Sequence, residues 1–161
     1  YLLLKPPIIR RGIMKNRKRG FSLVELLIVL AVIAALIATI TPVAMNAIRK
    51  SQATKVVQNM KTLASSFESY VYVNGKAPTK LTDIGRDIDP AKYGIVYNES
   101  EVGGAYTVTI LTVDPAEASA VADISSDLKS GSYTITEDNT GLNTLTGAEV
   151  TFYYPYSFVN Y

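Results

Sequence analysis

The 161-residue chain contains no cysteine, no histidine and no tryptophan. Without cysteine there are no disulfide bonds, zinc-thiolate sites or thiol nucleophiles, so the fold must be held by packing alone. Without histidine there are no Ser-His or Cys-His dyads, and the commonest metal ligand is missing. We therefore expect a protein that is not an enzyme and that needs no metal or other cofactor.

Acidic residues are missing from the first twenty positions, which carry seven basic side chains. From Phe21 onward the balance reverses, because nine basic and fourteen acidic side chains leave a net charge of −5. From Asn74 to the end, five basic and twelve acidic side chains leave −7. Such a segment repels a phosphate backbone, so we predict no nucleic-acid contact for the globular domain.

One long apolar segment covers residues 21–41, where Glu25 is the only ionisable side chain, and Pro42 follows it. As a helix with a rise of about 1.5 Å per residue it is about 30 Å long, the thickness of a bilayer's hydrocarbon core. The basic residues before it predict a cytoplasmic N-terminus and an exported C-terminal part. The segment is longer than a signal-peptide core and lacks an Ala-x-Ala cleavage site after it, so we expect the anchor to be retained.

The residues before the anchor read as a short basic leader. Met14 opens the leader, residues 14–20, whose charge comes from Lys15, Arg17, Lys18 and Arg19. We expect translation to start at Met14 and residues 1–13 to be an upstream, non-native extension. The alternative is a genuine basic extension with an apolar tip.

The junction Arg-Lys-Arg-Gly-Phe-Ser-Leu-Val-Glu, residues 17–25, closely resembles the prepilin cleavage site. This site is shared by type IV pilins and the pseudopilins of type II secretion and DNA-uptake systems. The resemblance implies that a membrane-embedded prepilin peptidase cuts between Gly20 and Phe21 and then methylates the new amine of Phe21. Glycine suits such a site because, having no side chain, it lets a protease approach the backbone closely.

Glu25 is the second feature of the resemblance. A carboxylate within an apolar helix costs about 2.5 to 3.5 kcal/mol on insertion scales, and such acids usually have a partner. Cleavage before Phe21 creates an amine with a pKa of about 8 at the helix end where the dipole favours an anion. The resemblance implies that Glu25 pairs with the amine of a neighbouring subunit and sets the axial register of a fibre. The alternative is an acid near the helix end that headgroups solvate.

Pro42 is a third match, because the family commonly carries a proline at this distance from the cut. Proline removes one helical hydrogen bond and favours a kink or local melting. We expect Thr39 and Thr41 to supply replacement hydrogen bonds to the freed carbonyls. The resemblance implies that the helix loosens here in a fibre. The alternative is that Pro42 marks the end of the membrane segment.

The remaining chain predicts an α+β fold, in which a long N-terminal helix packs against a small antiparallel β-sheet, as in pilins. Apolar residues at three- and four-residue steps predict an amphipathic helix over 42–73, ended by Asn74-Gly75. Residues 74–161 form the expected globular domain, with strands at 94–98, 106–113, 132–136 and 149–154. Short helices are expected near 82–87 and within 115–129.

Two other groups of residues allow alternative interpretations. Asp83, Asp87 and Asp89 suggest a calcium loop, but they lack the order of an EF-hand, so solvated loop acids are the favoured reading. The aromatic residues that crowd the C-terminus form either a partner-binding patch or, as we favour, sheet core with an aromatic edge.

The sequence thus predicts a structural subunit, a type IV pilin or minor pilin, that assembles into a cell-surface or periplasm-spanning fibre. Its expected partners are copies of itself, other pilins, the prepilin peptidase, and an assembly ATPase acting through a platform protein. Before assembly it would be a single-pass inner-membrane protein with its C-terminal domain outside, and afterwards part of a pilus or pseudopilus at the cell surface. Alternatives are a pseudopilin of a type II secretion or DNA-uptake system and a monomeric, membrane-anchored binding protein.

Overall fold

The computed structural model describes residues 20–101, 103–135, 140–143, 145 and 148–161. The predicted leader charges Lys15, Arg17, Lys18 and Arg19 and the extension 1–13 lie outside the described residues. The elements in chain order are α1 (Leu23–Asn74), the 3-10 helix η1 (Leu81–Asp83), β1 (Tyr93–Glu99), β2 (Ala105–Thr112), α2 (Ala118–Ile124), β3 (Lys129–Ser130), β4 (Thr140–Leu142) and β5 (Phe152–Val159). The chain divides into two compact units, of which the first ends at Thr41 and the second begins at Pro42.

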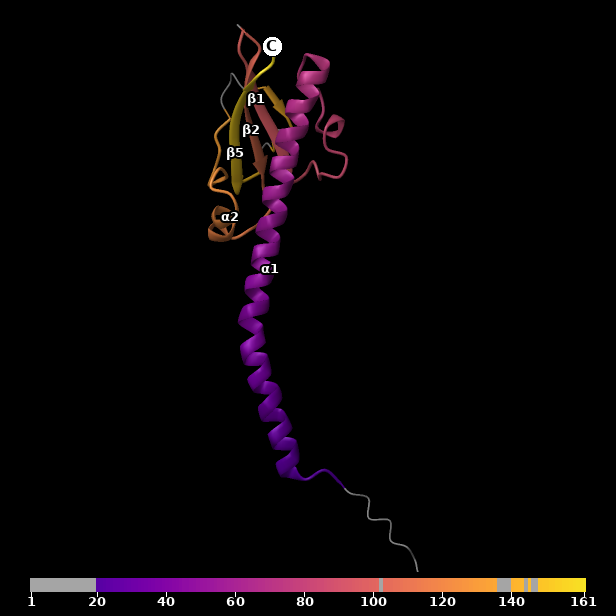
Figure 1. The fold of residues 1–161 in the computed structure, drawn as a ribbon, viewed down its shortest axis with the longest axis vertical. Helices are drawn as coiled ribbons and strands as arrows, with labels where there is room; N and C mark the ends of the chain where they lie inside the picture. The colour runs from indigo at the N-terminus through magenta and orange to yellow at the C-terminus, as the bar shows by residue number, and fades with distance from the viewer. Residues whose placement is uncertain (1–19, 102, 136–139, 144, 146–147) are drawn as a thin grey trace, which may run out of the picture. The chain divides into compact units, whose positions relative to one another are not determined.

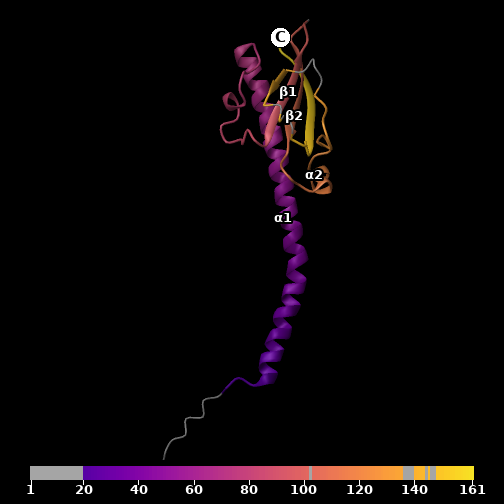
Figure 2. The ribbon, with the colours of Figure 1, turned by 180° about the vertical axis from the view of Figure 1, so that it is seen from behind.

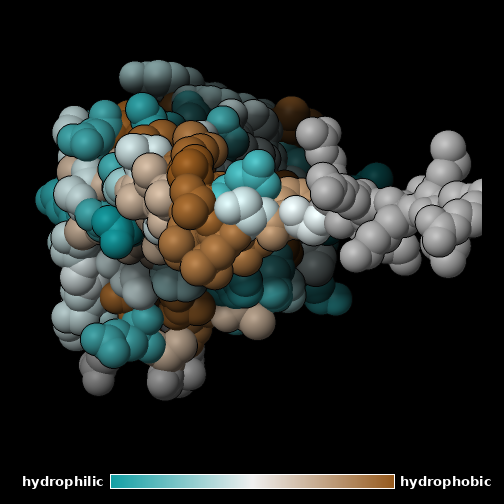
Figure 3. Space-filling view, turned by 90° about the horizontal axis from the view of Figure 1, so that it is seen from below, coloured by the Kyte–Doolittle hydropathy of each residue, from teal (hydrophilic) through white to brown (hydrophobic). Residues whose placement is uncertain are grey.

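In the first unit, α1 is apolar on every side and every described side chain is exposed. The space-filling view shows hydrophobic side chains uncovered on the face turned to the viewer (Figure 3). A helix that is hydrophobic all round needs burial in a membrane or in a large assembly. This stretch therefore has no partner of its own within the described part of the chain.

Pro42 lies inside α1, and the helix is continuous through it. The hydroxyl of Thr41 donates a hydrogen bond to the carbonyl of Ile37 at 2.7 Å, and that of Thr39 to the carbonyl of Leu36 at 2.9 Å. The carbonyl that proline leaves without its helical N–H partner belongs to Ala38, four residues earlier. The expectation that the two threonines replace the missing hydrogen bond is therefore wrong, because their hydroxyls bond carbonyls that already lie in the helical ladder.

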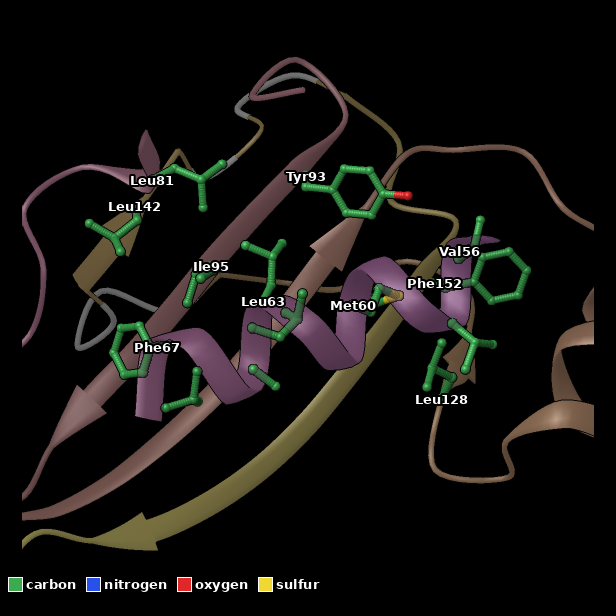
Figure 4. Close-up of a cluster of buried hydrophobic side chains, with 14 of the residues drawn as sticks. Val56, Met60, Leu63, Phe67, Leu81, Tyr93, Ile95, Leu128, Leu142 and Phe152 are labelled. Atoms are coloured by element: carbon green, nitrogen blue, oxygen red, sulfur yellow. The ribbon is translucent and has the colours of Figure 1, made fainter. Parts of the chain in front are cut away.

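In the second unit, α1 buries one stripe of side chains at the predicted three- and four-residue spacing. Figure 4 shows Val56, Met60, Leu63 and Phe67 projecting from the helix toward Ile95 and its neighbours in the sheet. The full stripe comprises Ala53, Val56, Val57, Met60, Leu63, Ala64, Phe67 and Val71. As predicted, the helix ends at Asn74, and Gly75 follows with φ +69 and donates its N–H to the carbonyl of Val71 at 2.8 Å.

Five antiparallel strands form one sheet in the order β3-β5-β2-β1-β4. The C-terminal half of α1 lies along one face of this sheet, as both ribbon views show (Figures 1 and 2). The predicted α+β arrangement of a long helix packed on a small antiparallel sheet is confirmed. The C-terminal strand β5 is an interior strand, because it pairs with β2 over its whole length and with β3 at its other edge.

The opposite face of the sheet carries a second, smaller core. It consists of Val96, Leu111, Leu145 and Val150, with Tyr133 and Tyr153 packed against it. The ring centroids of Tyr133 and Tyr153 are 5.4 Å apart. The prediction of a strand at 132–136 is wrong for residues 132–135, which form no strand. Tyr133 packs on the face of the sheet, whereas Ser132, Thr134 and Ile135 are exposed, and residue 136 lies outside the described residues.

The other predicted elements differ mainly in length. The expected helix at 82–87 is the single turn η1, and the expected helix within 115–129 is α2. The last strand begins at Phe152 and runs to Val159, so the prediction of 149–154 started too early and ended too soon. Tyr154, Tyr156 and Phe158 pack against the main core beside α1, which agrees with the favoured reading of the C-terminal aromatic residues.

Polar contacts join the helical segment to the sheet in place of a disulfide bond. Three ion pairs, Arg49–Glu117, Lys61–Asp127 and Lys92–Asp114, each link a cation before β1 to an acid after it. The hydroxyl of Tyr93 donates to Asp114 Oδ2 at 2.8 Å and accepts from the side-chain amide of Asn59 on α1 at 3.1 Å. These buried bonds fix the helix to β1 and to the segment after β2.

Candidate processing and assembly site

Gly20 and Phe21, the residues flanking the predicted cut, lie before the first turn of α1. Neither belongs to a helix or strand, and both are exposed, Phe21 to 84%. Apart from its two chain neighbours, no heavy atom of the described residues lies within 4 Å of the position that a Cβ on Gly20 would occupy. Within the described part of the chain, no other side chain packs over Gly20.

The start of α1 is fixed by two reciprocal hydrogen bonds. Oε2 of Glu25 accepts the backbone N–H of Ser22 at 3.1 Å, and Oγ of Ser22 accepts the N–H of Val24 at 3.3 Å. This arrangement is a variant of the capping box, in which the N-cap hydroxyl bonds the second helical N–H instead of the third. It holds the helix start at Leu23 and leaves the peptide bond before Phe21 outside the helix.

Ser22 is a site residue that the sequence analysis missed. The available signal was the pattern Ser-x-x-Glu directly before an apolar run, which is typical of a helix N-terminus. The same pattern gives Glu25 a partner within its own chain before any cleavage. The carboxylate is thus hydrogen-bonded through one oxygen, and no ion pair to it forms within the part of the chain that is described.

Four of the predicted site residues lie within the described part of the chain, and the structure brings three of them together. Gly20, Phe21 and Glu25, with Ser22, line an open hollow of about 480 Å³ at the start of α1. Pro42 does not contribute to this hollow, because it begins the second unit. Among the described residues, no group of three or more acids could hold a metal ion, and Asp83, Asp87 and Asp89 form no such group.

Comparison with known proteins agrees with this site. Residues 15–41 match the family model described as the prokaryotic N-terminal methylation motif. Over 72 residues the chain is 29% identical to the type II secretion system core protein G of Dickeya chrysanthemi. This match covers 45% of the chain and 47% of the relative, so the chain spans about half the length of the curated relative it matches. No solved structure matches the chain.

The matched residues include the hollow at Gly20, Phe21 and Glu25 and extend through the exposed apolar half of α1. The chain therefore carries the prokaryotic N-terminal methylation motif and resembles the family of type IV pilins and type II secretion pseudopilins.

Proposed function

We propose that this protein is a structural subunit of pilin type, which is cut between Gly20 and Phe21, methylated on Phe21, and polymerised into a fibre through α1. The observation that carries the proposal is that an exposed, non-helical Gly20–Phe21 junction directly precedes the capped start of α1, whose first, apolar half is exposed. One helix of the described chain, α1, is long and apolar enough to cross a membrane. Its apolar half lacks a partner among the described residues, and a bilayer or a bundle of identical helices would supply one.

The assembly step follows from the charges at the start of α1. Cleavage would leave an ammonium group on Phe21, one residue before the N–H that Glu25 Oε2 accepts. The other carboxylate oxygen remains for an ammonium of the same or a neighbouring copy. Pairing with a neighbour would remove an uncompensated charge from the apolar surroundings and set the axial register between two helices. An ATPase acting through a platform protein would supply the work, as the resemblance implies.

A second candidate within the family is a pseudopilin of a type II secretion or DNA-uptake system. The similarity to the secretion protein G favours it, although that similarity covers less than half of either chain. A monomeric, membrane-anchored binding protein is the candidate of another class. Such a protein would need neither the Gly20–Phe21 junction nor a carboxylate held at the start of its anchor.

The deciding experiment is intact-mass measurement and N-terminal sequencing of the protein from its native membranes and from sheared fibres. We expect a chain that starts at Phe21 and is about 14 Da heavier than the unmodified sequence, as a single methyl group requires. A Gly20→Val variant should keep its leader, because a β-branched side chain hinders access to the bond. Wild-type protein that is uncut, or cut beyond Thr41, would remove the pilin interpretation and leave the plain anchor or a secreted domain.

A further inference from the structure

The uncharged part of α1 continues beyond Pro42. No ionisable side chain occurs from Leu26 to Ile48, a stretch of 23 residues between Glu25 and Arg49. At about 1.5 Å per residue this stretch is about 34 Å long, close to the thickness of a hydrocarbon core with its immediate boundaries. Val43, Met45 and Ile48 are about half exposed or more, and the first residue of α1 that the domain buries is Ala53. The helix is thus uncovered up to the point where charges return.

A polar cleft opens where the charges return. Its volume is about 270 Å³, and it is lined by Asn46, Arg49 and Lys50 on α1 and by Glu117, Ser119, Ala120, Asp123 and Ile124 on and beside α2. Two cations and two carboxylates therefore face one space. The cleft lies wholly within the second unit.

Two of the four charges that line the cleft, Arg49 and Glu117, already form an ion pair with each other. Arg49 Nε lies 3.3 Å from Glu117 Oε2, and the hydroxyl of Ser119 donates to Glu117 Oε1 at 2.9 Å. Both oxygens of Glu117 are engaged, whereas the guanidinium of Arg49 has further N–H donors besides Nε. The hydrogen-bonded group of Arg49, Glu117 and Ser119 forms one wall of the cleft.

The other two charges, on Lys50 and Asp123, are exposed and have no ion-pair partner within the described part of the chain. The cleft therefore offers one free cation beside a guanidinium with spare donors, and one free carboxylate. A ligand that satisfies both must carry an anion and a hydrogen-bonding cation within a few bonds of each other. Because the four lining charges cancel, the cleft does not favour a purely anionic partner.

We propose that this cleft binds the zwitterionic headgroup of phosphatidylethanolamine in the exported leaflet, with the phosphate at Lys50 and Arg49 and the ammonium at Asp123. The proposal rests on the membrane anchoring of the unassembled subunit. A bilayer that covers Leu26 to Ile48 places Lys50 and Arg49 at the depth of the phosphates. The bound headgroup seats the domain on the membrane before the subunit joins a fibre.

The binding test is native mass spectrometry of the full-length chain with phosphatidylethanolamine, phosphatidylcholine and phosphatidylglycerol at equal concentration. Phosphatidylcholine has the same net charge but its ammonium has no N–H donor. We expect phosphatidylethanolamine adducts to exceed the other two by about fivefold, as a charge-assisted hydrogen bond in a polar cleft allows. Equal retention of the three lipids, or preference for phosphatidylglycerol, would overturn the proposal.

Two pairs of variants locate the binding. Lys50→Gln and Asp123→Asn should each lower the abundance of phosphatidylethanolamine adducts to that of phosphatidylcholine adducts. Their matched controls are Lys55→Gln and Asp87→Asn, which remove the same charges from exposed positions that do not line the cleft and form no ion pair among the described residues. Loss of the preference in the controls, or its persistence in both cleft variants, would contradict the assignment.

A depth measurement separates this proposal from the proposed function. The chain has no tryptophan, so Leu36→Trp and Ile48→Trp each introduce a single probe. In vesicles of brominated lipids we expect the fluorescence of both tryptophans to be quenched. The tryptophan at position 36 should be quenched most by lipids brominated deep in the acyl chains, and the tryptophan at position 48 by lipids brominated near the headgroup. Quenching at Leu36 alone would place the cleft away from the headgroups and overturn this inference only, whereas quenching at neither position would overturn membrane anchoring itself.

Discussion

The hydroxyl of Tyr156 donates a hydrogen bond to the backbone carbonyl of Ala64 at 2.9 Å, joining the last strand to α1 across 92 residues of sequence. The ring of Tyr156 stacks between those of Tyr154 and Phe158, at centroid distances of 5.5 and 6.1 Å. Because the chain has no disulfide bond, contacts of this kind hold the C-terminal strand on the helix.

Removing that hydroxyl should weaken the domain without disturbing the rings. We expect Tyr156→Phe to lower the free energy of unfolding by about 1 kcal/mol, the usual net contribution of one hydrogen bond. Chemical denaturation of the full chain in detergent, followed by far-UV circular dichroism, measures this change. Tyr154→Phe is the control, since its hydroxyl forms no hydrogen bond within the described residues. Equal losses in the two variants would contradict a specific role for the bond to Ala64.

Alkaline pH should destabilise the domain through its buried tyrosines. Burial, together with the carboxylate of Asp114, raises the pKa of Tyr93 to about 12, against the opposing hydrogen bond from Asn59. Burial, and then Glu99, raises the pKa of Tyr106 to about 12. Because the pKa is raised in the folded state, these tyrosines contribute fully to the free energy of unfolding below their unfolded pKa of about 10. That contribution is lost as the pH rises toward 12.

Thermal unfolding monitored at pH 8 to about 12 checks this expectation, with tyrosinate absorbance as a second signal. The melting temperature should stay level up to about pH 9 and fall steeply above about pH 10. In Tyr93→Phe the fall should be shallower, because one of the buried tyrosines with a raised pKa is gone. A melting temperature that does not change up to pH 12 would show that ionisation of these hydroxyls does not limit stability.

Gly94 in β1 should tolerate no side chain. A Cβ there would collide with the backbone carbonyl of Asn143, a residue held at φ 56 whose amide donates to the carbonyls of Tyr93 and Pro90. Because the obstacle is backbone, Gly94→Ala should lower the free energy of unfolding by about 2 to 3 kcal/mol. Asn98→Ala, at an exposed position of the same strand, is the control and should change it by less than about 0.5 kcal/mol. Denaturation of both variants side by side tests the difference.

Glu25→Gln should separate processing from assembly. The amide still accepts the N–H of Ser22, so the helix start and the cut before Phe21 should remain. It carries no charge to pair with the new ammonium, so we expect the sheared-fibre fraction to fall by about tenfold or more, the effect of losing one charge-assisted contact. Glu68→Gln, on α1 outside the apolar half, serves as the control. Normal fibre yield from Glu25→Gln would remove the ion pair from the assembly mechanism.

Local patterns in the sequence were sufficient for a large part of this fold. The run of apolar residues from Phe21, the spacing of Val56, Met60, Leu63 and Phe67, and the stop at Asn74-Gly75 all depend on neighbours within a few residues, so the helix was predictable almost to its ends. The strands β1 and β2 were predictable for the same reason. The junction at Gly20 and Phe21 and the isolated acid at Glu25 likewise stand out in sequence alone.

Residues distant in sequence decided the rest. Residues 132–135 have the composition of a strand, but Tyr133 packs against Tyr153 on the face of the sheet, and this contact between distant residues is not visible in any local pattern. The cleft of Lys50 and Asp123 exists only because α2 is brought beside α1. The sequence by itself determined where the chain is apolar, where it carries the N-terminal methylation motif, and where its long helix ends. Only the tertiary structure decided which polar groups meet, because hydrogen bonds such as Tyr93 to Asp114 require two segments to be packed before either finds its partner.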